Sequence, residues 1–268
     1  MVGATHPRGR PAVALHPGMR GSTQVVHDDL RARILTGELP AGSELAQARV
    51  AADYGVSRGP VREAFRMLER EGLLAAQVNQ RCHVMPISLT DVEHVYALRV
   101  ANESLALTVS VPRMTADELA TMEGLLPALS DPRSQDFDTW ESRHQQFHAL
   151  LVHHVEPPMR QVLAQWADHT SRYRRVYLAD ETGGWSQGAR EHAQLLEHCR
   201  NADVPAAGRL LAQHLSRAAV TLLASMDPGY EPALLRAAVR QVVAAADAAA
   251  QQQGEDRPTR RRLPAAGA

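Results

Sequence analysis

The sequence contains no lysine, so all 29 of its basic residues are arginine. It has only two cysteines, Cys82 and Cys199, and their spacing matches no metal-binding or redox motif, which predicts ordinary reduced thiols. Aromatic residues make up 4% of the chain, so a core must be largely aliphatic. No apolar run reaches the roughly 18 residues that a membrane helix needs, and no signal peptide opens the chain. These absences predict a cytoplasmic protein that does not enter a membrane.

The stretch from Tyr54 to Leu74 carries the clearest local signals. Gly55 ends a short helix pattern, Ser57 is placed to cap the next helix, and Pro60 falls in the first turn, where its missing N–H costs nothing. Apolar residues then recur at helical spacing on one face: Val61, Ala64, Phe65 and Leu68. Arginines fall four apart on the other face: Arg58, Arg62 and Arg66. The pattern is typical of a helix-turn-helix, and equally of an amphipathic surface helix with a solvated charged face.

The flanking segments favour the first interpretation. Upstream, helical spacing marks a further helix at Val26, Leu30 and Ile34. Downstream, apolar residues alternate on both sides of a polar turn, which predicts a β-hairpin, or wing; they are Leu74, Ala76, Val78, Cys82 and Val84. Residues 23–86 hold eight arginines and eight acidic residues, so DNA binding must depend on where the charges lie. The candidate DNA-binding residues are Arg49, Ser57, Arg58, Gly59, Pro60, Arg62, Arg66, Asn79, Gln80 and Arg81.

These residues resemble the GntR family of bacterial transcription regulators. The matching positions are Gly37, Pro40-Ala41-Gly42, Leu45, Gly55-Val56-Ser57-Arg58, Pro60-Val61-Arg62-Glu63-Ala64, Leu68 and Gly72-Leu73. The resemblance implies a homodimer that binds a near-palindromic double-stranded DNA operator, in most cases as a repressor. One departure is Arg81, which stands where the family usually has a glycine in the wing tip.

From Pro86 onward the pattern is helical throughout. Two capping boxes, Thr90–Glu93 and Thr115–Glu118, each open a helix. We therefore predict a mainly α protein, in which an N-terminal winged helix-turn-helix over residues 23–86 precedes a C-terminal all-α antiparallel helical bundle over residues 90–227. An extra C-terminal helix follows over residues 228–250. The terminal segments 1–22 and 251–268 are expected to be disordered.

Four of the thirteen histidines lie on apolar helix stripes of the predicted bundle. His144 and His148 are four apart on one helix, and His192 and His214 lie on two later helices. An i, i+4 histidine pair with two more imidazoles on neighbouring helices is an arrangement that holds a divalent ion in a bundle. The alternative is four separate core histidines, each satisfied by its own hydrogen bonds.

Residues from about 90 to 225 resemble the FCD domain, the effector domain of the FadR branch of the same family. Its Phe-His, Glu-His and final His motif matches Phe147-His148, Glu191-His192 and His214. The resemblance implies a metal held by three histidines and an aspartate four residues before the first, a position occupied here by His144. An imidazole in place of a carboxylate favours Zn²⁺ or Ni²⁺ over Mn²⁺ or Ca²⁺.

The same resemblance points to an effector site. Arg99 corresponds to an arginine of the first FCD helix that could clamp a small carboxylate, although an Arg99–Glu103 helix pair is the alternative. Arg172 is a second candidate effector-binding residue.

Three classes of function remain at this stage. The first is a ligand-responsive regulator, in which effector binding reaches the DNA-binding domain through the helix near Thr90 and the linker Pro86–Leu89. The second is a metal-sensing regulator with a closed four-histidine site. The third is a metal-dependent hydrolase. The sequence contains no HExxH motif, and a hydrolase function would not explain the first 86 residues, so we expect no enzymatic activity.

Overall fold

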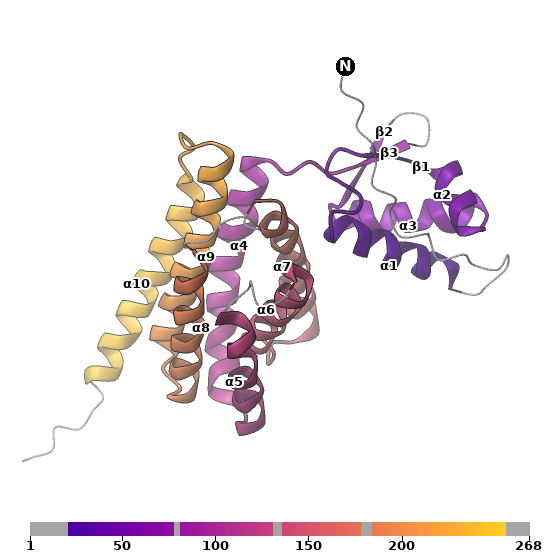
Figure 1. The fold of residues 1–268 in the computed structure, drawn as a ribbon. Helices are drawn as coiled ribbons and strands as arrows, with labels where there is room; N and C mark the ends of the chain where they lie inside the picture. Colours follow the sequence, from indigo (N-terminus) through magenta and orange to yellow (C-terminus); the bar gives the residue numbers. More distant parts are fainter. Residues whose placement is uncertain (1–20, 78–80, 131–135, 178–183, 256–268) are drawn as a thin grey trace, which may run out of the picture.

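The computed structural model describes residues 21–77, 81–130, 136–177 and 184–255. A small N-terminal domain with a three-stranded sheet is joined by a short linker to a larger bundle of helices (Figure 1). The predicted fold class is confirmed: the chain is mainly α, with a winged helix-turn-helix followed by an all-helical bundle.

The N-terminal domain packs three helices against a small antiparallel sheet. Its elements are α1 (Ser22–Leu35), β1 (Glu44–Ala46), α2 (Gln47–Tyr54), α3 (Arg58–Arg70), β2 (Leu74–Gln77) and β3 (Arg81–Val84). The strand order is β1-β3-β2, and Cys82 lies opposite Leu45 on one side and Ala76 on the other. The apolar faces predicted for α1 and α3 meet in a single core with Leu74, Cys82 and Val84 of the sheet. Periodicity alone therefore identified the core of this domain.

The turn between α2 and α3 has the conformation of a helix-turn-helix. Gly55 adopts φ of 67°, the left-handed region in which glycine has no Cβ penalty, and it ends α2 there. The prediction that Ser57 caps α3 with its side chain is wrong: Ser57 has an extended backbone before the helix, but its hydroxyl makes no capping hydrogen bond. The wing-tip residues Asn79 and Gln80 lie outside the described residues.

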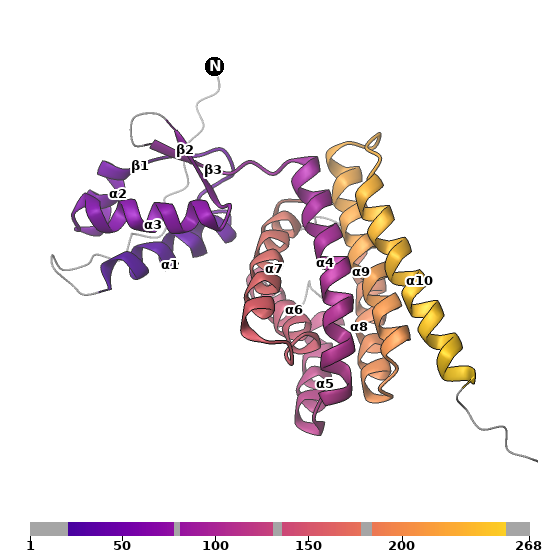
Figure 2. The same cartoon turned by 180° about the vertical axis from the view of Figure 1, so that it is seen from behind.

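The C-terminal domain is a bundle whose first helix lies against several others. Its elements are α4 (Leu89–Ser110), η1 (Val111–Arg113), α5 (Ala116–Ser130), α6 (Phe137–Leu151), α7 (Pro157–Tyr177), α8 (Gly184–Arg200), α9 (Val204–Met226) and α10 (Ala233–Glu255). Helix α4 packs against α7, α9 and α10, and α5 packs against α6 and α8 (Figures 1 and 2). No helix in these ranges is long and apolar enough to span a membrane.

The two predicted capping boxes have different outcomes. At α5, Thr115 Oγ1 accepts from the Glu118 amide at 3.2 Å, and the Glu118 carboxylate accepts from the Thr115 amide at 2.8 Å, as predicted. The prediction of a capping box at Thr90–Glu93 is wrong, because Ser88 caps α4 by accepting from the Asp91 amide. Buried Glu93 instead accepts from the Leu234 amide at 2.7 Å, and so holds the N-terminus of α10 against α4.

Two helices extend into the predicted terminal tails. Helix α1 begins at Ser22, the last residue of the predicted N-terminal tail. Helix α10 continues to Glu255, so the first part of the predicted tail 251–268 is helical. The run of alanine and glutamine before Glu255 explains the extension, since these residues have high helix propensity.

Helix α7 is the part of the bundle that contacts the N-terminal domain. Arg31 of α1 forms an ion pair with Asp168 of α7, and its Nε also donates to Glu71 at 2.9 Å. On the next residue of α7, the His169 Nε2–H donates to the Glu71 carbonyl oxygen at 2.7 Å. These polar contacts connect the two domains independently of the linker that precedes α4.

Candidate metal and ligand site

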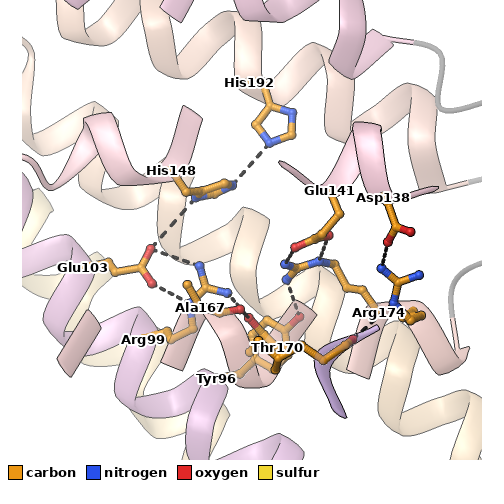
Figure 3. A network of polar contacts seen from close by, with 12 residues as sticks. Tyr96, Arg99, Glu103, Asp138, Glu141, His148, Ala167, Thr170, Arg174 and His192 are labelled. Carbon is orange, nitrogen blue, oxygen red and sulfur yellow. Dashed lines mark hydrogen bonds and ion pairs between the residues drawn. The ribbon is translucent and has the colours of Figure 1, made fainter. Parts of the chain in front are cut away.

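The four candidate histidines converge inside the bundle. His144 and His148 lie one turn apart on α6, His192 lies on α8 and His214 on α9, and all four are buried. One ligating atom of each lies within 4.8 Å of those of the others. The Nε2 atoms of His148 and His192 are 3.4 Å apart, and Figure 3 shows this contact between the two rings. The tertiary structure thus brings together residues that are up to 70 positions apart (214 minus 144).

Burial keeps these imidazoles neutral. It lowers the pKa of His144, His148 and His192 well below the ordinary histidine value, and the neighbouring cationic side chains and imidazoles add to the effect. Burial also lowers the pKa of His214, although the hydrogen bond that its ring donates to Glu191 acts in the opposite direction. A neutral imidazole has a free lone pair, which is the form that coordinates a metal.

The hydrogen-bond inventory argues against four separately satisfied core histidines. The Nδ1 atoms of His144, His148 and His192 are buried and have no hydrogen-bond partner among the described residues, and that of His148 lies 4.0 Å from Glu103 Oε2. Leaving a buried polar atom without a hydrogen bond costs about 1–3 kcal/mol each. Four buried imidazoles that are not each satisfied separately, and whose ligating nitrogens lie within 4.8 Å of one another, fit a site that accepts a cation, so they match the metal that the fold family implies.

Glu191 and Arg217 orient one ligand of this cluster. The His214 Nδ1–H donates to Glu191 Oε2 at 2.8 Å, which leaves Nε2 as the free lone pair of that ring. Glu191 also accepts from Arg217 Nε at 3.0 Å and from Gln187 at 2.8 Å. Burial alone would raise the pKa of Glu191, but these hydrogen bonds lower it below the usual glutamate value. Glu191 is therefore an ionised carboxylate that orients the His214 ring, and it is itself held by Arg217 and Gln187.

Two further Arg–Glu pairs lie beside the histidines. Arg99, only 1% exposed, donates from Nε to Glu103 at 2.5 Å and from Nη1 to Thr170 at 2.5 Å (Figure 3). Of the two roles that the sequence allowed for Arg99, the structure shows the helix pair with Glu103. Arg174 of α7 donates to both carboxylate oxygens of Glu141, at 2.5 and 3.1 Å. Burial opposes the charge on Arg174, yet Glu141 and Tyr96 raise its pKa above the ordinary value.

Two cavities reach the histidine cluster from different sides. The first, which we call the Trp140 cavity, has a volume of about 70 Å³ and is lined in part by Trp140, Arg174 and Arg217 together with His144, His192 and His214. The second, the Arg160 cavity, has a volume of about 170 Å³. It is lined in part by Arg99, Glu103, His148, Arg160 and Asp168. Space beside the histidines is therefore available on both sides of the cluster.

Arg172, the second effector candidate, lies elsewhere. Its guanidinium donates to the carbonyl oxygen of Met85, at the end of the wing, and it lines neither the Trp140 cavity nor the Arg160 cavity. Arg172 therefore contacts the N-terminal domain, because its side chain lies on the side of α7 that is turned towards that domain. The cavity-lining arginines other than the predicted Arg99 are Arg160, Arg174 and Arg217. Arg217 could have been found from its position three residues after His214, on the same helix face.

The DNA-binding candidates form an exposed face on the N-terminal domain. Arg58, Gly59, Arg62 and Arg66 are exposed on the first turns of α3, and Arg49 is exposed on α2. Within the described part of the chain, Arg49, Arg58 and Arg62 make no ion pair, whereas Arg66 contacts Glu63 at 3.5 Å. Arg81 of the wing is exposed and donates to Glu44 at 2.9 Å. The arginines nearest the start of α3 are therefore those with charge available for a partner.

A winged helix-turn-helix with exposed arginines, joined to an all-helical domain with a buried polar centre, defines a class of ligand-sensing DNA-binding regulators. The profile described as "Bacterial regulatory proteins, gntR family" matches residues 22–84, and that of the FCD domain matches residues 94–217. The chain belongs to the GntR family and carries an FCD domain, as in the FadR-type branch. It is accordingly a transcriptional regulator rather than an enzyme.

Similar proteins agree with this placement. An uncharacterised HTH-type transcriptional regulator, BphR of Paraburkholderia xenovorans, is 31% identical over 209 residues, covering 74% of this chain and 83% of the relative. The gluconate operon transcriptional repressor of Bacillus licheniformis is 30% identical over 141 residues, covering 51% of this chain and 56% of the repressor. The solved structure of Escherichia coli McbR/YncC superposes with a TM-score of 0.67 at 21% identity, covering 78% of this chain and all of that one, which supports the fold.

Proposed function

We propose that the protein is a homodimeric cytoplasmic repressor whose helical domain binds a divalent metal, Zn²⁺ or Ni²⁺, together with a small carboxylate that alters operator binding. The observation that carries the proposal is the convergence of four buried neutral histidines in the FCD domain, connected by α7 to a DNA-binding domain. Repression is the direction named for the gluconate operon relative.

The metal part rests on the donor set. His144, His148, His192 and His214 supply four nitrogen donors and no carboxylate, a combination that suits borderline ions better than hard ones. Glu191 fixes the tautomer of His214, as carboxylates do beside many metal-bound histidines. When bound, the metal would supply a Lewis-acidic position for one oxygen of a ligand.

The carboxylate part follows from the charges around the cluster. Arg99, Arg174 and Arg217 are each paired with a glutamate, and the four imidazoles are neutral, so the surrounding groups nearly cancel. A divalent cation at the centre would add two buried positive charges with no protein anion to offset them. An anionic ligand in the Trp140 or Arg160 cavity would reduce that cost. The existence of these cavities favours an open site over the closed metal-sensing alternative.

Helix α7 provides a route from this site to the DNA-binding domain. On its bundle side, Thr170 binds Arg99. Asp168 both lines the Arg160 cavity and binds Arg31 of the N-terminal domain. Arg175 donates from Nε to the Leu35 carbonyl oxygen at 3.2 Å. A ligand that moves α7 would therefore shift the DNA-binding domain directly, in addition to any change through the linker that precedes α4.

Metal analysis tests the first part of the proposal. Protein purified without a polyhistidine tag should contain about one equivalent of zinc or nickel per chain, as expected for a single four-ligand site. His148→Ala and His192→Ala should each remove most of it, whereas His94→Ala, at an exposed position on α4, should not. A folded parent that neither contains nor takes up metal would contradict the proposal.

A panel of small organic acids, screened by thermal shift with and without Zn²⁺, tests the second part. We expect a hit whose stabilisation requires the metal and disappears in His148→Ala. Equal stabilisation of the metal-free variant would mean that the ligand does not bind at the histidine cluster. Metal-dependent operator binding with no organic hit would instead support the closed metal sensor.

A further inference from the structure

One buried histidine outside the bundle lies where the two domains meet. His27 of α1 is 5% exposed, and both nitrogens of its ring face carboxylates. Its Nδ1 lies 2.8 Å from Asp28 Oδ1, and its Nε2 lies 2.6 Å from Glu71 Oε1. Both distances are those of hydrogen bonds, and an ionised carboxylate has no proton to donate. The ring is therefore the donor that both contacts require.

The number of protons on this ring decides whether both contacts are attractive. A neutral imidazole has one N–H and one lone pair, so it donates to one carboxylate and turns its lone pair towards the other. An imidazolium donates to both, and each of these bonds is charge-assisted. Gln24 lies 3.4 Å from His27 Nδ1 and donates to Asp28 at 2.7 Å, so it does not replace the ring at Glu71. A proton on His27 therefore strengthens both carboxylate contacts at once.

Glu71 connects this ring to the bundle. It is the C-cap of α3, its Oε2 accepts from Arg31 Nε at 2.9 Å, and its carbonyl oxygen accepts from the His169 Nε2–H at 2.7 Å. Arg31 in turn binds Asp168 of α7. Figure 1 shows α7 on the side of the bundle that faces the N-terminal domain. The contacts of Glu71 with His27 and Arg31 thus determine how α1 and the end of α3 meet α7.

The charges in direct contact at this junction are unbalanced. Three carboxylates take part, and their ionisable partners among the described residues are one arginine and one imidazole. The carboxylates are those of Asp28, Glu71 and Asp168, and the partners are Arg31 and His27. A proton on His27 reduces the excess of negative charge at a partly buried site, where charges are screened less than in open water.

The other titratable and charged groups that α7 brings to the junction do not take over this role. Burial lowers the pKa of His169, so its ring stays neutral and its bond to the Glu71 carbonyl oxygen needs no added proton. Arg172 binds the Met85 carbonyl oxygen and makes no ion pair within the described ranges. His27 is therefore the group whose proton changes the contacts between the domains.

We propose that a proton-sensitive contact between the domains, which we call the His27 clasp, is formed by His27, Asp28, Arg31, Glu71 and Asp168. Protonation of His27 closes the clasp and holds the DNA-binding domain against α7, and loss of that proton loosens it. Operator binding then depends on pH through a residue that belongs neither to the histidine cluster nor to the DNA-binding candidates. The clasp requires no metal and no organic ligand, so it goes beyond the effector site of the proposed function.

Limited proteolysis of the full-length chain at pH 6.0 and pH 8.0 tests the clasp. The cleavage rate in the segment between β3 and α4 is divided by the rate for a peptide of the same sequence at the same pH, which removes the pH dependence of the protease. This normalised rate should rise about threefold or more from pH 6.0 to pH 8.0 in the parent, because a proton bound in the closed state shifts the equilibrium by up to about tenfold per pH unit. The bundle histidines act in the opposite direction, since their protonation at low pH favours unfolding.

Three variants make this readout specific. His27→Gln removes the titrating ring but keeps a side chain that forms hydrogen bonds, so its normalised rate should be nearly the same at both pH values. His169→Gln is the matched control from the same junction: it weakens the contact with Glu71 but should keep the rise of the parent. If far-UV circular dichroism shows that His27→Gln is unfolded, Glu71→Gln takes its place, because it removes the charge that attracts the imidazolium and should reduce the rise.

Fluorescence anisotropy at the same two pH values measures the effect on DNA binding. Operator affinity should change with pH more in the parent than in His27→Gln, and the difference is the contribution of the clasp. A parent with equal normalised cleavage at both pH values, or a folded His27→Gln variant that keeps the rise of the parent, would overturn the proposal. Equal pH dependence of operator affinity in the parent and in His27→Gln would do the same. None of these outcomes bears on the metal or the organic acid, which are tested separately.

Discussion

Several charged side chains of this protein are buried as ion pairs of an arginine with a glutamate. Arg99 with Glu103 and Arg174 with Glu141 lie inside the bundle, where an unpaired charge would be costly. The histidines between them stay neutral because burial prevents protonation. Replacing one member of such a pair should therefore damage folding, whereas the exposed arginines of α3 can be changed without that effect.

Arg58 and Arg62 provide the residue-scale test of DNA binding. Each is exposed near the N-terminal end of α3, where side chains of a recognition helix reach base edges. Alanine at either position should cost about 1–3 kcal/mol of operator affinity if the arginine makes a bidentate base contact. Fluorescence anisotropy with operator DNA measures this. Arg70→Ala, exposed at the other end of α3, is the control and should bind nearly as well as the parent.

The buried histidines also predict a pH dependence of stability in the metal-free protein. Their pKa values are lowered in the folded state, so below pH of about 6.5 the unfolded state binds more protons. The free energy of unfolding should therefore fall as pH drops from 7.5 to 5.5, by about 1.4 kcal/mol for each histidine that stays neutral when folded. Urea unfolding in EDTA, followed by tryptophan fluorescence, reports on the bundle, where all three tryptophans lie.

A variant isolates the histidine contribution to this slope. His144→Gln removes one of the titrating groups, so its unfolding free energy should change less between pH 7.5 and 5.5 than that of the parent. An unchanged slope in the variant would mean that the pH dependence arises elsewhere.

At the scale of elements, α7 combines two roles on its opposite sides. Thr170 and Arg174 face the polar centre of the bundle, and His169 and Arg172 bind backbone oxygens of the N-terminal domain. A rigid helix that contacts both sites can transmit a displacement without unfolding, which makes it a physical link between them.

Asp168→Asn tests this link. Burial raises the pKa of Asp168, although the ion pair with Arg31 acts in the opposite direction. Removing the charge should weaken the interdomain contact, so limited proteolysis should cut faster in the segment between β3 and α4. Asp247→Asn breaks a comparable pair, Arg209–Asp247, between α9 and α10 and serves as the control. Equal protection in both variants and the parent would exclude an interdomain role for Asp168.

At the scale of the whole molecule, metal, ligand and DNA sites are expected to be coupled. A ligand changes operator affinity only by its differential affinity for the two arrangements of the DNA-binding domains, typically about 1–3 kcal/mol, or 5- to 150-fold. Because the coupling is reciprocal, operator DNA must change ligand affinity by the same factor.

Titration calorimetry of the organic acid found by thermal shift, with and without operator DNA, measures that factor. It should match the change in operator affinity caused by the same compound. The His148→Ala variant should show neither change. Unequal factors in the parent would mean that the two sites do not communicate through one equilibrium.

The N-terminal domain could be predicted from the sequence because its signals are local. The glycine at the end of α2, the proline in the first turn of α3 and the apolar spacing from Val61 to Leu68 each act within a few residues. The histidine pair His144 and His148 was recognisable for the same reason, since an i, i+4 spacing fixes one helix face.

Only the tertiary structure decided which faces meet. Periodicity does not show that Glu93 would hold α10 rather than cap α4, that Arg172 would bind Met85 rather than a ligand, or that Arg217 would lock Glu191. Each of these contacts joins residues far apart in sequence, and it depends on the relative rotation and offset of packed helices. A one-dimensional pattern specifies an apolar face for each helix, but the pairing of the polar groups at its edges is determined by three-dimensional packing.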